Sequence, residues 1–190
     1  MAHLSILGTG NMGQAIAAVA GRGGHDVHLV GHHDTTTELG DVVVLAVPYP
    51  AVADVLATRG EALAGKIVVD ITNPLNFETF DSLTVPADAS ATAEIAAALP
   101  QSRVLKAFNT TFAATLSSGT VGSLPTTVLI AGDDTDAKTE LAGIVTSGGL
   151  KAVDAGSLQR ARELEAIGFL QITLAAAEKI SWTGGLGVVA

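Results

Sequence analysis

The sequence of 190 residues contains no cysteine, and only 4% of its residues are aromatic and 15% charged. Without cysteine, a disulfide framework, thiolate catalysis and cysteine-ligated zinc are excluded. The net charge of −9 disfavours nucleic acid and anionic membrane surfaces as partners, and no basic cluster overrides it. The sequence also has no apolar run of membrane-spanning length and no signal-type N-terminus. We therefore expect a cytoplasmic protein that binds neither nucleic acid nor membrane.

Short apolar runs alternate with helix-like stretches along most of the chain. The runs are His3–Leu7, Val27–Val30, Val42–Ala46, Ile67–Asp70, Val104–Ala107, Thr127–Ala131 and Leu150–Val153. Most of them are continuously apolar, which is typical of parallel strands covered on both faces. The helix-like stretches are Met12–Ala20, Ala51–Ala64, Ala91–Ala98 and Asp136–Val145. This alternation predicts an α/β fold with a doubly wound, mostly parallel sheet and right-handed crossovers.

One connection is too short for a comfortable crossover helix. Only eleven residues separate Val30 from Val42, and they include Gly31, Gly40 and three threonines. We expect a loop or a single turn there, which would leave the adenine side of a nucleotide site open.

The C-terminal part of the chain has a different pattern. We expect one dinucleotide-binding domain over residues 1–155 and a helical segment with a tail over residues 156–190. The segment from Ser157 to Ile180 is apolar almost all round between Leu164 and Ala177, so it has to be buried. It is expected to pack on the same domain or at the interface of a homodimer.

The hexapeptide GTGNMG follows the first strand-like run and opens the first helical stretch. In this context a GxGxxG motif indicates a dinucleotide-binding turn. We expect Gly8 to form the tight turn, Gly10 to admit the pyrophosphate, and Gly13 to allow close helix packing. The amides of Asn11 and Met12 are expected to bind the negative charge. The alternative is a glycine-rich turn that serves packing alone.

The end of the second strand indicates which dinucleotide is bound. NAD sites usually have an acidic residue there, which accepts a hydrogen bond from the ribose 2′-hydroxyl. Here Gly31, His32 and His33 follow the strand, so nothing acidic repels a 2′-phosphate at that position. Protonated histidines can donate to the phosphate, so we favour NADP over NAD. If they do, the preference for NADPH should weaken between about pH 6 and pH 8; alternatively, both histidines are solvated loop residues.

Polar and turn-forming residues follow three further strand-like runs, and all should meet at the carboxyl edge of the sheet. Val47, Pro48 and Tyr49 follow the third run, and Asn73 and Pro74 follow the fourth. Ligands bind at this edge in open α/β folds. Asn73 could bond the nicotinamide carboxamide, although Asn-Pro is also common in turns.

Residues near the last strands allow two interpretations. Asn109 follows the fifth run, next to Phe108, which we expect in the core. Asp154, Arg160 and Arg162 could face the cleft, but solvated ion pairs explain the two arginines equally well.

No nucleophile–base pair and no metal site emerges from the spacing of the histidines and carboxylates. We therefore predict no catalytic residue and no metal. Hydride transfer between two stacked heterocycles needs mainly positioning, because the cofactors supply the chemistry. A redox enzyme is consistent with this lack of an acid–base group.

Six segments occur in a familiar order: GTGNMGQA, VVVLAVPYPAV, VVDITNPLN, VLKAFNT, AGDD and DAGSLQRARELE. Together they resemble the NADP-dependent oxidoreductase family that includes the coenzyme F420-dependent NADP reductases. The same module resembles the cytoplasmic reductase domain of the STEAP metalloreductases. The resemblance implies an NADP(H)-binding Rossmann domain, commonly dimeric, in which hydride passes between nicotinamide and a flavin or deazaflavin. By motif, the residues implied to line the cleft are Thr9, Gly10, Asn11, Met12, Pro48, Tyr49, Asn73, Pro74 and Asn109.

The sequence departs from that family in two places, the loop after the second strand and the abbreviated second crossover. The loop Gly31–Asp34 lacks the serine and arginine contacts to the 2′-phosphate that are usual in the F420 enzymes. The hydride acceptor stays open among coenzyme F420, FMN, FAD and a small carbonyl compound. The alternative function is an NADP(H)-binding redox sensor without turnover.

Overall fold

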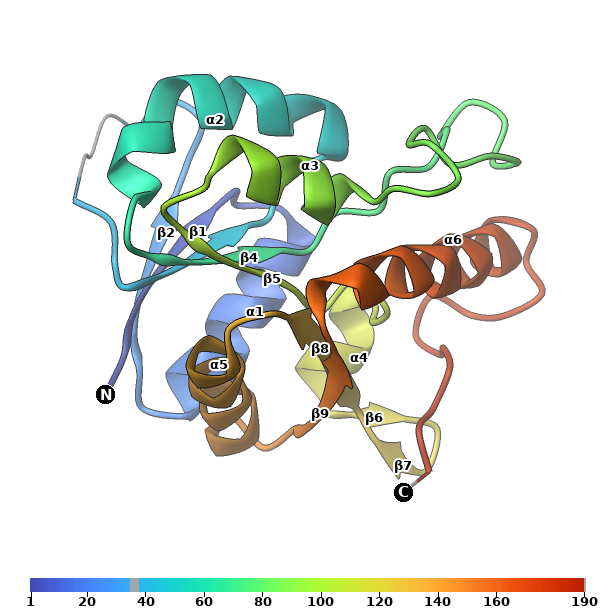
Figure 1. Ribbon diagram of the computed structural model, residues 1–190. Coiled ribbons are helices and arrows are strands. Elements are labelled where there is room, and N and C mark those ends of the chain that lie inside the picture. The colour runs from blue at the N-terminus through green and yellow to red at the C-terminus, as the bar shows by residue number, and fades with distance from the viewer. Residues whose placement is uncertain (35–37, 190) are drawn as a thin grey trace.

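The computed structural model describes residues 1–34 and 38–189, which form a sheet with helices on both faces (Figure 1). The strands are β1 (His3–Leu7), β2 (Asp26–Val30), β3 (Val42–Leu45), β4 (Ile67–Asp70), β5 (Arg103–Lys106), β6 (Thr120–Val121), β7 (Leu124–Pro125), β8 (Thr127–Gly132) and β9 (Lys151–Gly156). The helices are α1 (Asn11–Arg22), α2 (Tyr49–Leu63), α3 (Ala91–Ala98), α4 (Ala113–Ser118), α5 (Thr135–Ser147), the short 3₁₀ helix η1 (Leu158–Arg160) and α6 (Ala161–Ala176).

The main sheet has the strand order β2-β1-β3-β4-β5-β8-β9. From β2 to β5 all neighbouring strands are parallel. After β2 the chain crosses to the other side of β1, so the direction of winding reverses between β1 and β3. In open α/β sheets, ligands bind at the carboxyl ends of the strands beside such a reversal. The predicted doubly wound, mostly parallel Rossmann sheet is confirmed.

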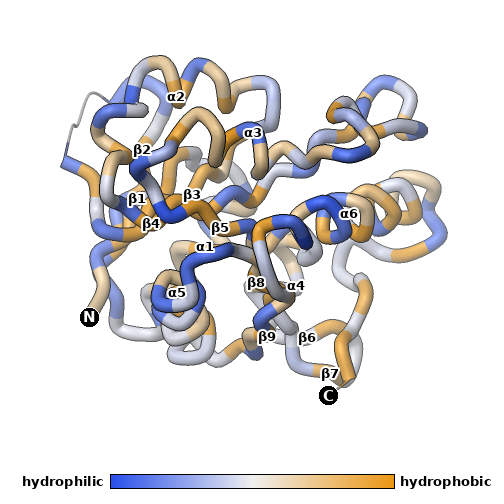
Figure 2. The backbone as a smooth tube through the Cα atoms, in the orientation of Figure 1, coloured by the Kyte–Doolittle hydropathy of each residue, from blue (hydrophilic) through white to orange (hydrophobic). Residues whose placement is uncertain are grey.

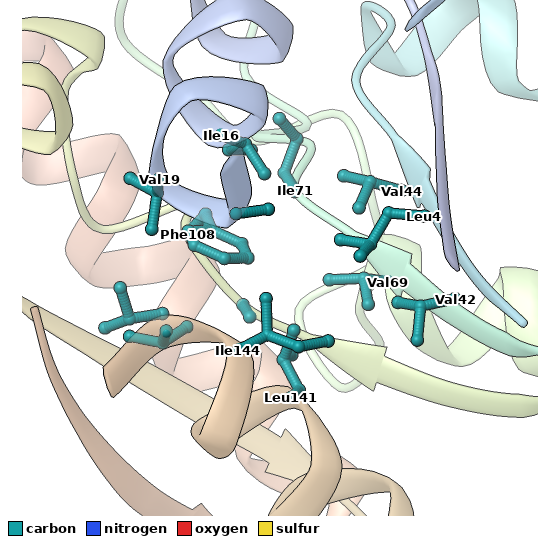
Figure 3. Close-up of a cluster of buried hydrophobic side chains, with 14 of the residues drawn as sticks. Leu4, Ile16, Val19, Val42, Val44, Val69, Ile71, Phe108, Leu141 and Ile144 are labelled. Carbon is teal, nitrogen blue, oxygen red and sulfur yellow. The ribbon is translucent and has the colours of Figure 1, made fainter. Parts of the chain in front are cut away.

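The two faces of the sheet have separate apolar cores. One core lies between the sheet and helices α1 and α5, and it includes Ile16, Val44, Phe108 and Ile144 (Figure 3). The other core includes Val43, Val68 and Ile95 and lies under α2 and α3. Because both faces are covered, β3 (VVVL) is apolar throughout and β4 (IVVD) is apolar up to its last residue; Figure 2 shows the hydropathy along the backbone.

The strand β8 is an exception to the parallel arrangement. It pairs antiparallel with β5, with Lys106 opposite Ala131, and parallel with β9. The sequence analysis did not find α4 or the two-stranded β6–β7 ribbon, which together occupy the connection from β5 to β8. Ala131 of β8 lies opposite Lys106 on one side and opposite Gly156 of β9 on the other. The end of β9 is therefore level with the carboxyl end of β5, and α6 starts beside it.

Helix α6 is buried along one face within the chain. It packs against α3 and β8, and its buried face includes the polar residues Glu165 and Gln171. Leu170, on another face, is 52% exposed. Gln171 donates to the carbonyl of Thr110 and accepts from the amide of Leu186, so the buried polar groups of α6 have specific partners. The apolar residues of the α6 sequence therefore did not indicate which face of this helix is buried.

The short connection after β2 agrees with its expected form where the structure describes it. Residues 31–34 and 38–41 contain no helix, and Thr35–Thr37 lie outside the described residues. Among the helices that the structure describes, none has both the length and the apolarity needed to cross a membrane.

Candidate dinucleotide-binding site

The glycines of the β1–α1 turn are required at two positions by their surroundings. Gly8 has a φ of +121°, and a Cβ there would lie 2.1 Å from the carbonyl oxygen of Ala46. At Gly13 a Cβ would lie 2.2 Å from the carbonyl oxygen of Gly8. A side chain at Gly8 would therefore displace the turn from the end of β3, and one at Gly13 would separate α1 from the turn.

Gly10 differs from these two glycines, because a Cβ there would meet no described atom within 4 Å. It is the residue before α1, and the amides of Asn11 and Met12 follow it in the first turn. That turn reads Asn-Met-Gly-Gln, so it carries no carboxylate that would repel an anion. Packing within the chain does not explain the glycine at position 10, whereas close approach of a pyrophosphate does.

A cavity of about 840 Å³ adjoins this turn on the β2 side. It brings together residues from the ends of β1, β2 and β3 and from one face of α2. Of the residues predicted from the sequence, those that line it are Gly8, Thr9, Gly31, His32 and Val47. In size and position, it suits the adenosine half of a dinucleotide.

The two histidines after β2 are in different positions. Both are exposed, and their ring centroids are 4.9 Å apart, but of the two only His32 lines the cavity. The sequence analysis did not single out Arg59, which lines the cavity from α2. A signal was available, because Ala51, Val55 and Arg59 are four residues apart and so share one face of a helix.

Pro48 and Tyr49 lie at the start of α2. Pro48 is exposed and precedes the helix, while the half-buried Tyr49 donates its hydroxyl proton to Oε2 of Glu94 on α3. Burial, followed by the hydrogen bond to Glu94, raises the pKa of Tyr49 above its usual range. The phenol therefore stays protonated at neutral pH and joins α2 to α3.

Asn73 and Asn109 form a pair at the ends of β4 and β5. The Asn109 amide donates to Oδ1 of Asn73 at 3.0 Å, and the Asn73 amide donates to the carbonyl of Asn109 at 3.0 Å. Asn109 also donates to the carbonyl of Leu164 on α6 at 2.8 Å. Within the described residues, Oδ1 of Asn109 is buried without a hydrogen-bond partner. Pro74, next to Asn73, is buried. The pair therefore connects the carboxyl edge of the sheet to α6.

A buried charge cluster lies beside this pair, and the sequence analysis did not find it. Nζ of Lys106 donates to Oδ2 of Asp70 at 2.9 Å, to Oε1 of Glu165 at 3.0 Å and to the carbonyl of Thr72 at 2.6 Å. The Lys106, Asp70 and Glu165 side chains are each 1% exposed or less. Because its ammonium group is enclosed by carboxylates, Lys106 is part of the scaffold and does not reach the cavity.

Glu165 also caps a helix on a neighbouring element. Its Oε2 accepts from the amide of Ala91 at 3.0 Å and its Oε1 from that of Thr92 at 3.3 Å, both in the first turn of α3. Burial raises the pKa of Glu165, although the Lys106 ammonium opposes the shift. The hydroxyl of Thr92 donates to Asp70, so α3, α6 and the sheet share one polar network.

Three further residues from the sequence analysis are also placed by the structure. Phe108 is 1% exposed and belongs to the core, as predicted. Asp154 accepts from Lys138 on α5, which, with the Gly156 amide, lowers the pKa of Asp154. Arg160 lies 3.5 Å from Glu163, an exposed ion pair that agrees with the solvated interpretation.

A family profile and a protein of known activity that match this chain have equivalent descriptions. The profile of a family described as NADP oxidoreductase, coenzyme F420-dependent, matches residues 28–74. The F420-dependent NADP reductase of Methanocaldococcus jannaschii is 33% identical over 149 residues, which cover 76% of this chain and 66% of that protein. The metalloreductase STEAP3 of Rattus norvegicus is 36% identical over 112 residues, covering 59% of this chain and 22% of that protein. This chain thus matches about two thirds of the archaeal protein and about a fifth of STEAP3.

One solved structure matches along both whole chains. It comes from Arthrobacter sp. FB24, is described as a candidate F420-dependent NADP reductase, and superposes with a TM-score of 0.86 at 24% identity. At that identity the match supports the fold alone. The family profile and the archaeal relative, together with the glycine turn and the cavity beside it, support a closer relationship. The chain belongs to the NADP oxidoreductase family described as coenzyme F420-dependent, a family of enzymes.

Proposed function

We propose that this protein is an NADP(H)-dependent oxidoreductase that passes hydride between the nicotinamide and a flavin or a deazaflavin of the coenzyme F420 type. The observation that carries the proposal is the β1–α1 turn. There, Gly8 and Gly13 are fixed by packing, whereas Gly10 faces open space at a helix N-terminus without carboxylates. Family membership supports the same cofactor and the same class of acceptor.

In the proposed reaction, the residues of the chain bind and orient the dinucleotide. The amides of Asn11 and Met12 would hold the pyrophosphate, and the cavity along Gly31 and His32 would hold the adenosine half. The nicotinamide half would then extend toward Asn73 at the end of β4. When bound, NADPH would supply a hydride with its two electrons to the acceptor, which would take its proton from water.

Helix α6 supports the proposal that the protein forms a homodimer. Leu170 on α6 and Trp182 in the tail are each 52% exposed, and Leu186 is 48% exposed. All three belong to the C-terminal segment, and exposed large apolar side chains are typical of interaction surfaces when they form a patch. Light scattering on the purified protein should give twice the chain mass, and the mass of a single chain would contradict this proposal. A cytoplasmic location stays a prediction from the composition.

The proposed reaction is tested by following NADPH oxidation in the near ultraviolet with coenzyme F420, FMN or FAD as the acceptor. Turnover with one of these acceptors, together with loss of turnover in Gly10→Ala, would support the proposal and identify the acceptor. The variant Gly21→Ala, near the other end of α1, is the matched control, because a Cβ there also meets no described atom within 4 Å. Tight binding of NADPH without oxidation by any acceptor would favour a redox sensor instead.

A further inference from the structure

Arg59 lies on the face of α2 that lines the nucleotide cavity. The same cavity is lined by Gly31 and His32 from the end of β2. The guanidinium group of Arg59 reaches that segment directly, because its Nη2 donates to the backbone carbonyl of Asp34. A half-buried arginine of α2 is thus held against the loop that follows β2.

This position matters because the loop itself carries no arginine or lysine. The 2′-phosphate of NADP lies at the end of the second strand of a Rossmann fold, and an arginine nearby usually accommodates it. Here residues 31–34 read Gly-His-His-Asp. Among the described residues that line the cavity, Arg59 is the one with a permanent positive charge.

We propose that Arg59 binds the 2′-phosphate of NADP(H) from α2, together with His32, and so determines the preference for NADP over NAD. The proposal rests on the proposed NADP(H)-dependent function. It assigns to a helix on the far side of the cavity the role that an arginine after β2 usually has. The planar guanidinium group carries five N–H donors in a fixed fork, and the bond from its Nη2 to the Asp34 carbonyl holds it beside the end of β2.

The carboxylates around the cavity oppose the attraction between Arg59 and a phosphate, so their positions matter. Asp34 presents its backbone carbonyl to Arg59, while its carboxylate lies 3.7 Å from Nε2 of His28 on β2. Asp54 and Glu61 also line the cavity, but both are exposed. Exposed charges are screened over about 10 Å at 0.1 M salt, so their repulsion of a phosphate is weaker than the attraction of a half-buried guanidinium in contact.

The experiment measures the dissociation constants of four ligands for the full chain by calorimetry. NADPH is compared with NADH, and adenosine 2′,5′-bisphosphate with 5′-AMP, so each pair differs only in the 2′-phosphate. In Arg59→Gln, the dissociation constants of the two phosphorylated ligands should rise about tenfold to a hundredfold, the range of a charge-assisted hydrogen bond. Those of NADH and 5′-AMP should change less than about twofold.

Two further variants complete the design. Arg59→Lys keeps the charge but loses the fork, so it should retain part of the preference for the phosphorylated ligands. Arg103→Gln removes a positive charge at the start of β5, on the opposite edge of the sheet, and should leave all four constants unchanged. Circular dichroism and a thermal melt of each variant establish that the binding is measured on folded protein.

Two outcomes would overturn the proposal. If Arg59→Gln weakens NADPH and NADH equally, Arg59 contacts the adenosine that both ligands share. If it weakens neither, Arg59 serves only to hold the loop after β2. Failure of the wild-type protein to bind any of the four ligands would instead overturn the proposed function itself.

Discussion

Nζ of Lys106 on β5 lies 3.0 Å from Oε1 of Glu165 on α6, and both side chains are buried. The pair holds the C-terminal helix against the edge of the sheet at which the ligand site is proposed. Glu165 also accepts from two amides at the start of α3, so one carboxylate joins three elements. Together with the Asn109 bond to the Leu164 carbonyl, this carboxylate fixes the start of α6 against the sheet.

Replacing Glu165 by alanine should destabilise the fold strongly. The change leaves the Lys106 ammonium with one carboxylate, Asp70, and the Thr72 carbonyl, and it removes the acceptor for two amides of α3. Breaking a buried charge pair typically costs about 3–5 kcal/mol in the free energy of unfolding. Urea denaturation measures the loss, with the exposed Glu163→Gln on the same helix as the control. A loss in Glu165→Ala no larger than in the control would contradict the assigned role.

The stability of the protein should depend on pH through the same residue. Burial raises the pKa of Glu165 above its ordinary value of 4.5, so the folded chain keeps a proton that the unfolded chain has released. The free energy of unfolding should therefore fall as the pH rises from 4.5 through the folded-state pKa. Glu165→Gln resembles the protonated acid and cannot titrate. The stability of the wild type relative to this variant should decrease over that pH range, and a constant difference would contradict the shift.

Substitutions in the glycine turn should affect NADPH binding and folding stability separately. In Gly10→Ala the new methyl group meets open space, so the free energy of unfolding should change by less than about 0.5 kcal/mol. NADPH binding should weaken about tenfold or more, because the methyl group occupies the approach to the pyrophosphate. Gly8→Ala should instead lose about 1–3 kcal/mol of stability, since its φ of +121° and the nearby Ala46 carbonyl exclude a side chain. Unchanged NADPH binding in Gly10→Ala would place the pyrophosphate elsewhere.

The sequence allowed prediction of the sheet and the glycine turn, because both depend on local patterns. Continuous apolar runs indicate covered parallel strands, and GxGxxG between a strand and a helix has few other uses. Glu165 was not found because it follows Arg160, Arg162 and Glu163, a charged segment that is typical of a solvated helix start, and only the tertiary fold brings it to Lys106. Arg59 was not found because the usual place for a phosphate-binding residue is after β2, and α2 reaches that place only in the folded chain.

Gly168 on α6 should be sensitive to the smallest substitution, because it faces the asparagine pair. A Cβ there would lie 2.2 Å from Oδ1 of Asn73 and 3.0 Å from the carbonyl oxygen of Asn109. We expect Gly168→Ala to lose about 1–3 kcal/mol of stability, even though alanine is the better helix former by about 1 kcal/mol. The exposed Gly143 on α5 is the matched control, since a Cβ there meets no described atom within 4 Å and alanine should stabilise it.

The same variant tests where the nicotinamide half lies. If Asn73 orients that half, displacing its side chain should weaken NADPH binding in Gly168→Ala but leave the affinity for adenosine 2′,5′-bisphosphate unchanged, because that ligand ends at the adenosine side. Equal weakening of both ligands would show that the substitution disturbs the whole cleft. A neutral effect on stability would mean that Asn73 moves aside at little cost, and the pair would then be too loosely held to position a ring.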